Sequence, residues 1–180
     1  MKKKLVALCV LIVVMSGLTA CANSDMPAAR TEEQVAAFTG EITFDIPEEF
    51  TTTEEADGAT YYLHEEHPKV ESNISVTVSE NDDSFKFLSA KRYVSQIAKG
   101  LRNAYSKKAN SKIVEEKYLE IDGRRVFMYQ AEYKVADQEI TQIHYVIENA
   151  DELIAIIFTE RNTEGDLDTF KEVAETIRFE

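Results

Sequence analysis

The sequence has 180 residues, with 20 Lys or Arg against 33 Asp or Glu, which gives a formal net charge of −13. A chain this acidic should be repelled by nucleic acid and by anionic lipid head groups, so the composition argues against a nucleic-acid partner. A basic or cationic partner is the simplest functional interpretation of the charge. We favour the alternative that acidity keeps an exported protein soluble.

Residues 1–20 have the pattern of a secretory signal peptide. Three lysines follow Met1, and the run from Leu5 to Ala20 is uncharged and ends in small residues. A basic start, an apolar middle and a small-residue exit are typical of such signals. The uncharged run of 16 residues is short for a transmembrane helix, which needs roughly 20.

The end of this segment, Leu18-Thr19-Ala20-Cys21, resembles the bacterial lipobox. The resemblance implies that the Cys21 thiol is joined to diacylglycerol, that residues 1–20 are removed, and that Cys21 becomes the lipidated first residue. Each buried CH₂ contributes about 0.8 kcal/mol, so two or three acyl chains hold a protein stably on a bilayer. The alternatives are an ordinary cleaved signal or an uncleaved anchor. We predict a lipid-anchored protein on the extracytoplasmic face of a bacterial cell membrane.

The two cysteines fit this prediction. Cys9 would leave with the signal and Cys21 would carry lipid, so the mature chain would have no disulfide, no cysteine metal site and no cysteine nucleophile. Because the signal holds three lysines and no acid, 17 basic and 33 acidic residues remain after residue 20, a net charge of −16.

Residues 21–40 are predicted to be the lipidated cysteine and a flexible tether, and residues 41–180 a single globular domain. The tether is rich in small and polar residues. Within it, Thr31 and Gln34 fit a capping box, which predicts a short helix. The remaining domain is long enough to bury a core without disulfides or metal.

The first half of the domain predicts three strands and a helix. Alternation of apolar residues indicates strands at 42–46, 60–64 and 73–80. A helix follows, with Asp83 or Ser84 as its N-cap. Basic residues near its C-terminus are attributed to the negative end of the helix dipole. Its apolar stripe recurs at three- and four-residue steps: Ala90, Val94, Ile97, Ala98, Leu101 and Tyr105.

The second half predicts four strands and a closing helix. The strands at 112–122, 124–135, 139–149 and 152–160 have short links, which join antiparallel neighbours. The last is nearly all apolar, which indicates a central strand covered on both faces. A helix capped by Asp166 closes the chain. Its predicted buried stripe comprises Leu167, Phe170, Val173, Ala174 and Ile177.

The fold class is therefore α+β, an antiparallel sheet of six to seven strands flanked by helices, in the order βββαββββα. This order, "FDIPEEF" (44–50), the spacing from Gly123 to Tyr129, the aromatic strand pair and "FKEVAETIRF" (170–179) resemble the PsbP/Mog1 family of α/β/α sandwiches, to which exported DcrB-like lipoproteins are similar. The resemblance covers roughly residues 41–180. It implies a binding or assembly protein rather than an enzyme.

His64-Glu65-Glu66-His67 is the first candidate for chemistry. Zinc-protease helices place two histidines four residues apart, whereas these are three apart before a proline. Alternation along a strand would send them to opposite faces, so we favour a polar hairpin edge over a metal site.

Other candidates have simpler structural explanations. Residues 160–165 imitate the start of a calcium loop, but the twelfth position is Lys171, so a turn before the helix is favoured. His144 could act as a base, but the nearby hydroxyl candidates lack a nucleophile-elbow motif. Three acids in a loop before a helix are favoured there by electrostatics, namely Glu80, Asp82 and Asp83.

We therefore predict a lipid-anchored, extracytoplasmic binding or assembly module without catalytic activity, metal or cofactor. Its partners would be the membrane, through the N-terminal lipid, and a protein or another component of the cell envelope, basic in the simplest case. The alternative is an exported metal-dependent or hydrolytic enzyme that uses the region of His64 and His67.

Overall fold

The computed structural model describes residues 28–50, 52–65, 72–161 and 165–180. Its centre is a seven-stranded sheet of order β2-β3-β4-β8-β7-β6-β5, with every neighbouring pair antiparallel. The predicted antiparallel sheet is thus confirmed. Its strands are Thr52–Ala56 (β2), Ala59–Leu63 (β3), Asn73–Glu80 (β4), Ala109–Ile121 (β5), Arg124–Val135 (β6), Gln138–Asn149 (β7) and Glu152–Arg161 (β8).

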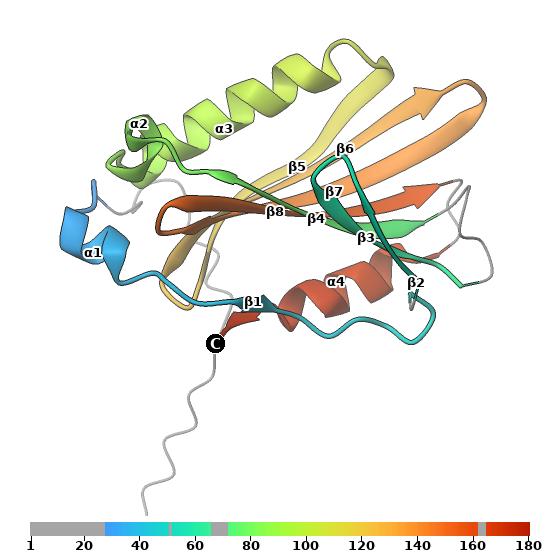
Figure 1. The fold of residues 1–180 in the computed structure, drawn as a ribbon. Coiled ribbons are helices and arrows are strands. Elements are labelled where there is room, and N and C mark those ends of the chain that lie inside the picture. Colours follow the sequence, from blue (N-terminus) through green and yellow to red (C-terminus); the bar gives the residue numbers. More distant parts are fainter. Residues whose placement is uncertain (1–27, 51, 66–71, 162–164) are drawn as a thin grey trace, which may run out of the picture.

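Helices lie on both faces of this sheet (Figure 1). On one face lie α2 (Asp83–Lys86) and α3 (Ala90–Tyr105), and on the other lies α4 (Leu167–Glu175). Helix α1 (Glu32–Ala36) lies at one end of the molecule. A separate two-stranded sheet pairs β1 (Ile42–Thr43) with β9 (Arg178–Phe179), joining the two ends of the described chain.

The core on the α4 side is aliphatic and aromatic. Alternate residues of β6, β7 and β8 pack there against Phe170, Val173 and Ala174 of α4, as the sequence pattern predicts. Burying such side chains contributes roughly 1.5–3 kcal/mol each. Sixteen residues form this core cluster, among them Phe50 from the loop before β2 and Ile177 from the loop after α4.

The core on the α3 side is dominated by tyrosine. Tyr93 and Tyr105 of α3 pack against the aromatic residues on one face of β6, Phe127, Tyr129 and Tyr133. The predicted α3 stripe is confirmed except that it omits Tyr93, which is fully buried. Because side chains alternate between the two faces of β6, Arg125 also lies on this side of the sheet.

The predicted helix from residue 83 is interrupted. Ser89, in extended backbone with φ −62° and ψ 153°, separates α2 from α3 and is the N-cap of α3. The Arg125 side chain donates hydrogen bonds to the carbonyl groups of Phe85, Lys86 and Leu88, and the Phe85 carbonyl also accepts from the Leu88 N–H. A long-range contact that the local sequence does not reveal therefore holds the chain where the helix is interrupted.

The strands at the edges also differ from the prediction. The predicted strand at 42–46 reduces to β1, and it pairs with β9 instead of joining the main sheet. Strand β2 was not predicted, because its sequence TTEEA lacks apolar alternation. Strand β8 is the central strand, as expected, but it is only half covered on the α3 side. Ala155 and Ile157 stay partly exposed there because α3 lies over β5 and β6.

Residues 30–40 form a segment packed on the domain, which we call the strap. The predicted capping box is present: the Thr31 side chain accepts from the Gln34 N–H, and the Gln34 side chain accepts from the Thr31 N–H. Val35 is buried, and Phe38 lies against Gly123 of the β5–β6 turn. The strap thus contacts the domain along a stretch that the sequence assigns to the flexible tether.

Candidate functional site

The structure places His64 just after β3, where its ring packs edge-on against Phe50 with centroids 5.3 Å apart. His67 lies outside the described residues. Among the described residues, no group of three or more His, Cys, Asp or Glu side chains could hold a metal ion.

Glu160, the first residue of the segment that imitates a calcium loop, binds the backbone just before α4. It is only 2% exposed, and its Oε1 accepts hydrogen bonds from the backbone N–H groups of Gly165 (3.0 Å) and Asp166 (2.9 Å). Asp166 occupies the N-cap position of α4, as predicted, but its side chain makes no capping hydrogen bond. A carboxylate from β8 takes its place and complements the positive end of the helix.

His144 is buried in a hydrogen-bonded network under the end of α3. Its Nε2 lies 2.5 Å from the Tyr105 hydroxyl, which donates to Oε1 of Gln142 at 2.6 Å. The Tyr133 hydroxyl donates to the same oxygen, and Gln142 Nε2 donates to Thr159. In this arrangement His144 donates its Nε2 proton to Tyr105.

Burial, reinforced by the Lys108 cation, lowers the pKa of His144 to about 4. Burial likewise raises the pKa of the Tyr105 hydroxyl. Both groups are therefore neutral at pH 7. A neutral histidine whose ring nitrogen is already bonded inside the fold is a structural element, as the sequence analysis favoured.

A charged cluster, absent from the sequence analysis, ties the strap to the sheet. Glu148 of β7 is fully buried and binds two arginines: Arg125 of β6 through Nε at 2.7 Å and through Nη2, and Arg30 of the strap through Nη1 at 2.7 Å. Arg30 also donates to the Gly123 carbonyl at 2.5 Å. The Arg125 guanidinium stacks 4.6 Å from the centroid of the Tyr93 ring.

In this cluster, burial disfavours the charges, and the attraction between Glu148 and its two arginines offsets that cost. Burial lowers the pKa of Arg30, and the neighbouring Glu148 carboxylate counteracts that effect. One sequence signal could have revealed Arg125: it has the same parity along β6 as the aromatic residues Phe127 and Tyr129, so alternation places it on a buried face. Nothing local indicates that Arg30 is its neighbour.

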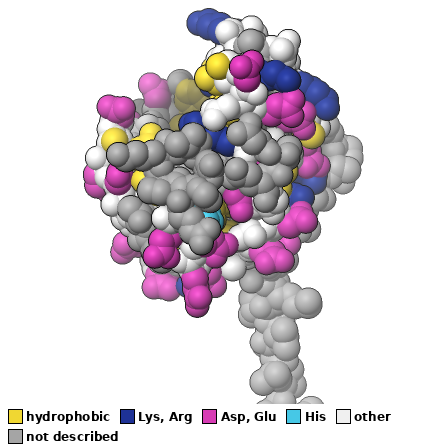
Figure 2. Space-filling view, turned by 90° about the vertical axis from the view of Figure 1, so that its right-hand side faces the viewer, with side chains coloured by type: hydrophobic (Ala, Val, Ile, Leu, Met, Phe, Trp, Pro, Cys, Tyr) yellow, Lys and Arg dark blue, Asp and Glu magenta, His cyan; other side chains and the backbone are white. Residues whose placement is uncertain are grey.

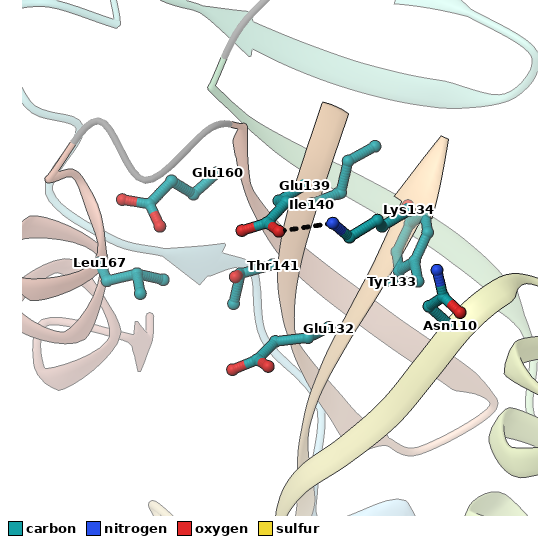
Figure 3. A pocket seen from close by; sticks show the side chains of 9 residues that line it. All are labelled: Asn110, Glu132, Tyr133, Lys134, Glu139, Ile140, Thr141, Glu160 and Leu167. Carbon is teal, nitrogen blue, oxygen red and sulfur yellow. Dashed lines mark ion pairs between the residues drawn. The ribbon is translucent and has the colours of Figure 1, made fainter. Parts of the chain in front are cut away.

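The candidate binding cavity lies at the ends of β6 and β7 that point away from the strap (Figure 3). It has a volume of about 290 Å³. Glu132, Thr141 and Glu160 occupy successive cross-strand positions on the α4 face, just beyond Leu167 at the start of α4. The cavity exists because the strands extend past the helix that covers them. Its further lining residues are Asn110, Tyr133, Lys134, Glu139 and Ile140.

The cavity offers hydrogen-bonding groups rather than a catalytic set. Lys134 Nζ binds Glu139 Oε1 at 2.7 Å at its rim, and Lys112 Nζ lies 3.7 Å from Glu132 Oε2. Its described lining contains neither histidine nor cysteine, and His144 lies on the opposite face of the sheet. Such a surface is suited to contacting polar or basic groups of a partner.

The family model for PsbP matches residues 33–178. The chain belongs to the PsbP family. The match begins within the strap, in agreement with the packing of the strap on the domain. No curated protein matches the sequence.

Solved structures agree on the fold. A cyanobacterial PsbP from Synechocystis sp. PCC 6803 is similar with a TM-score of 0.56 and 15% identity, covering 90% of this chain and 98% of that one. The Ran-binding protein Mog1p from Saccharomyces cerevisiae has a TM-score of 0.51 and 14% identity, covering 77% and 89%. A Pseudomonas aeruginosa protein of unknown function has a TM-score of 0.53 and 13% identity, covering 76% and 96%. The predicted PsbP/Mog1-like fold is confirmed.

Cys21, the predicted lipid attachment site, lies outside the described residues. Within the described part of the chain, no helix has the length and hydropathy to span a bilayer.

Proposed function

We propose that this protein is a lipid-anchored binding or assembly module without catalytic activity, held by Cys21 on the extracytoplasmic face of a bacterial cell membrane. The observation that carries the proposal is the match to the PsbP family over residues 33–178. The resemblance to that family implies a binding role, and one protein of similar fold, Mog1p, is named for binding Ran. The lipobox resemblance at residues 18–21 supplies the anchor.

The partner is a protein or another component of the cell envelope. The cavity beside Glu132 and Thr141 is the contact surface that the geometry favours, because it is concave, polar and open at the end away from the strap. Its carboxylates suit a basic segment of the partner.

Metabolic labelling with radioactive palmitate tests the anchor. We expect label on the natural protein and none on Cys21→Ser, which should also keep its signal peptide because lipoprotein processing requires the lipidated cysteine. Cys9→Ser serves as the matched control and should be labelled normally, since Cys9 lies within the signal. Labelling of Cys21→Ser at the natural level would refute the anchor.

Crosslinking in intact cells tests the binding role. A photoreactive amino acid at Thr141 should trap a defined partner, and the same amino acid at Asp57, in the exposed β2–β3 turn, should not. An identical crosslinking pattern at both positions, or no product at either, would count against the cavity as the contact surface.

A further inference from the structure

Positive charge is concentrated in one segment of this acidic chain. Residues 84–114 contain no Asp or Glu, yet they hold eight of the 17 basic residues that follow residue 20. The rest of the chain after residue 20 has nine basic and 33 acidic residues. A net charge of −16 therefore hides a strong separation of the two signs.

Helix α3 presents four of these eight cations on its outer side. Its buried residues, Tyr93, Ala98 and Tyr105 among them, face the sheet, whereas its basic side chains are exposed. At 100° per residue, the four basic residues of the helix fall within an arc of roughly 100°. Figure 2 shows Lys and Arg side chains gathered at the top of the molecule, where α3 lies, and Asp and Glu over much of the rest of that view. We call this surface the basic face: Lys91, Arg92, Lys99, Arg102 and Lys107.

Most of the basic face has no acidic partner in the described structure. Arg102 binds Glu116 of β5, with Nε 2.8 Å from Oε1. No described carboxylate pairs with any of the other four cations. By contrast, lysines elsewhere do pair with a neighbouring acid: Lys112, Lys117, Lys134 and Lys171.

Helix stability does not account for the basic face either. Lys91 and Arg92 occupy the first turn of α3, which contains no acid. The N-terminus of a helix carries partial positive charge, so cations there are unfavourable. The sequence analysis attributed the basic residues to the negative end of the helix dipole. That attribution applies to Arg102 and Lys107 only, because only they lie near the C-terminus of α3. Basic residues that are unfavourable for the helix and have no acidic partner within the described structure indicate an anionic partner outside the protein.

We propose that the basic face of α3 binds the anionic phospholipid head groups of the membrane in which the chain is anchored. The proposal rests on the proposed anchor at Cys21. It revises the expectation from net charge alone that the protein is repelled by anionic lipids, because a surface responds to the charges that face it within about a Debye length.

The strap brings the anchor to this side of the molecule. Arg30 binds Glu148, and the second partner of Glu148, Arg125, binds the carbonyls of Lys86 and Leu88 just before α3. Arg30 thus lies beside the segment that leads into α3. Only the eight residues from 22 to 29 separate Cys21 from Arg30, a span of about 30 Å at most.

The span of residues 22–29 is similar to the length of α3. Helix α3 has 16 residues, a length of about 24 Å, so it can lie along the bilayer while the acyl chains remain inserted. With α3 against the membrane, the acidic residues of α4 lie on the opposite side of the sheet, such as Asp168 and Glu172. Both attraction and repulsion then favour the same orientation.

Vesicles carrying the purified, lipid-anchored protein test this orientation. Since Cys21 is acylated and no other thiol remains in the processed chain, Ser95→Cys gives a single labelling site on the outer side of α3. Glu172→Cys on α4 gives the matched site on the opposite side. The measurement is quenching of a fluorophore at each site by lipids whose head groups carry a nitroxide.

In vesicles that contain phosphatidylglycerol we expect quenching at position 95 and little at position 172. In pure phosphatidylcholine vesicles the two sites should be quenched alike. Molar salt should abolish the difference, since the Debye length then falls to about 3 Å. Each cation near an anionic surface strengthens binding by about a factor of five.

Two charge-matched variants control for net charge. One replaces Lys91, Arg92, Lys99 and Lys107 by Gln, and the other replaces Lys112, Lys117, Lys134 and Lys171 by Gln. Only the first should lose the lipid-dependent quenching at position 95, and circular dichroism should show both folded. The proposal would be overturned if positions 95 and 172 were quenched equally in anionic vesicles. It would also be overturned if both variants lost the quenching at position 95 equally, or if position 95 became protected only after an acidic protein was added.

The experiment tests the lipid anchor and the basic face separately. Association of the protein with phosphatidylcholine vesicles reports the lipid anchor alone. Protein that requires phosphatidylglycerol to associate at all would refute the anchor and leave the basic face supported. Protein that associates with both vesicles but shows no difference between the two label positions would refute the basic face and leave the anchor intact.

Discussion

At the scale of single residues, Glu148 has the largest structural role. It is fully buried and compensates two arginines that come from β6 and from the strap. A buried ion pair is poor evidence of net stabilisation, since desolvation offsets much of the attraction. Removing one partner is nevertheless strongly unfavourable, because the remaining charge stays buried without compensation.

We expect Glu148→Gln to lower the free energy of unfolding by about 3–5 kcal/mol, the range found when a buried pair loses one member. Urea unfolding followed by circular dichroism measures the change. Glu139→Gln, which disrupts an exposed pair with Lys134, is the control and should differ little from the natural protein. Similar losses in both variants would show that the buried cluster has no special role.

His144 should make stability depend on pH. Its pKa in the folded protein is about 4, below the ordinary value of about 6.5, so between these pH values the unfolded chain binds a proton that the folded chain does not. The free energy of unfolding should therefore fall as pH decreases from 6.5 toward 4, by up to about 3 kcal/mol in total.

The comparison with His144→Gln isolates this effect from the titration of carboxylates. Thermal unfolding of both proteins at several values between pH 6.5 and 5 should show a smaller pH dependence in the variant. Parallel curves would mean that His144 titrates alike in the folded and unfolded chains.

At the scale of elements, the strap depends on the β5–β6 turn. This turn contains Asp122 at φ 49° and Gly123 at φ 74°, and the β2–β3 turn contains Asp57 at φ 51° and Gly58 at φ 76°. The two turns thus have nearly the same backbone φ angles, but they differ in which residues pack against the glycine. A Cβ on Gly123 would be 3.3 Å from Phe38 of the strap, and one on Gly58 would meet nothing within 4 Å.

Alanine at these two glycines therefore separates backbone strain from strap packing. Gly58→Ala should lose about 1 kcal/mol of unfolding free energy, the cost of a side chain in the left-handed region. Gly123→Ala should lose more, because Phe38 must also move. Chemical denaturation measures both, and equal losses would show that Phe38 yields freely.

Patterns within an element predicted most of the fold. Strands β3 and β4 alternate, β8 is nearly all apolar because it lies at the centre of the sheet, and α3 and α4 carry apolar stripes where they pack on the sheet. What the sequence did not predict depends on contacts between distant segments: the hydrogen bonds of Arg125 to the residues before α3, those of Glu160 to the residues before α4, and the strap held by Glu148. Strand β2 was not predicted because a strand at the exposed edge of a sheet needs no apolar pattern.

The candidate surfaces were only partly visible in the sequence. The cavity is formed by polar residues at the ends of strands, such as Glu132 and Thr141, which look like ordinary exposed positions until the register brings them together. The basic residues of α3 were visible, but only the structure shows that they share one side and that the strap begins near it.

At the scale of the whole molecule, the strap belongs to the folded unit. A chain that starts at Ala28 retains every described residue, whereas one that starts at Glu41 loses Arg30, Val35 and Phe38. We expect the longer chain to unfold like the processed protein. The shorter chain should lose at least about 2 kcal/mol, since burial of Val35 alone contributes about that much. Calorimetry of the three proteins measures the difference, and equal melting temperatures would show that residues 28–40 are dispensable.

The order of strands in the sheet has a consequence for how the chain acquires its fold. Strand β4 pairs with β8, and β1 pairs with β9, so the first strands synthesised await partners from the end of the chain. Contacts between such distant segments form slowly, because a long loop must close before any pairing is gained. Under the proposed export, a chain that crosses the membrane from its first residue onward would not complete the sheet until residues 152–161 had crossed. The topology would then keep the polypeptide unfolded for most of its passage.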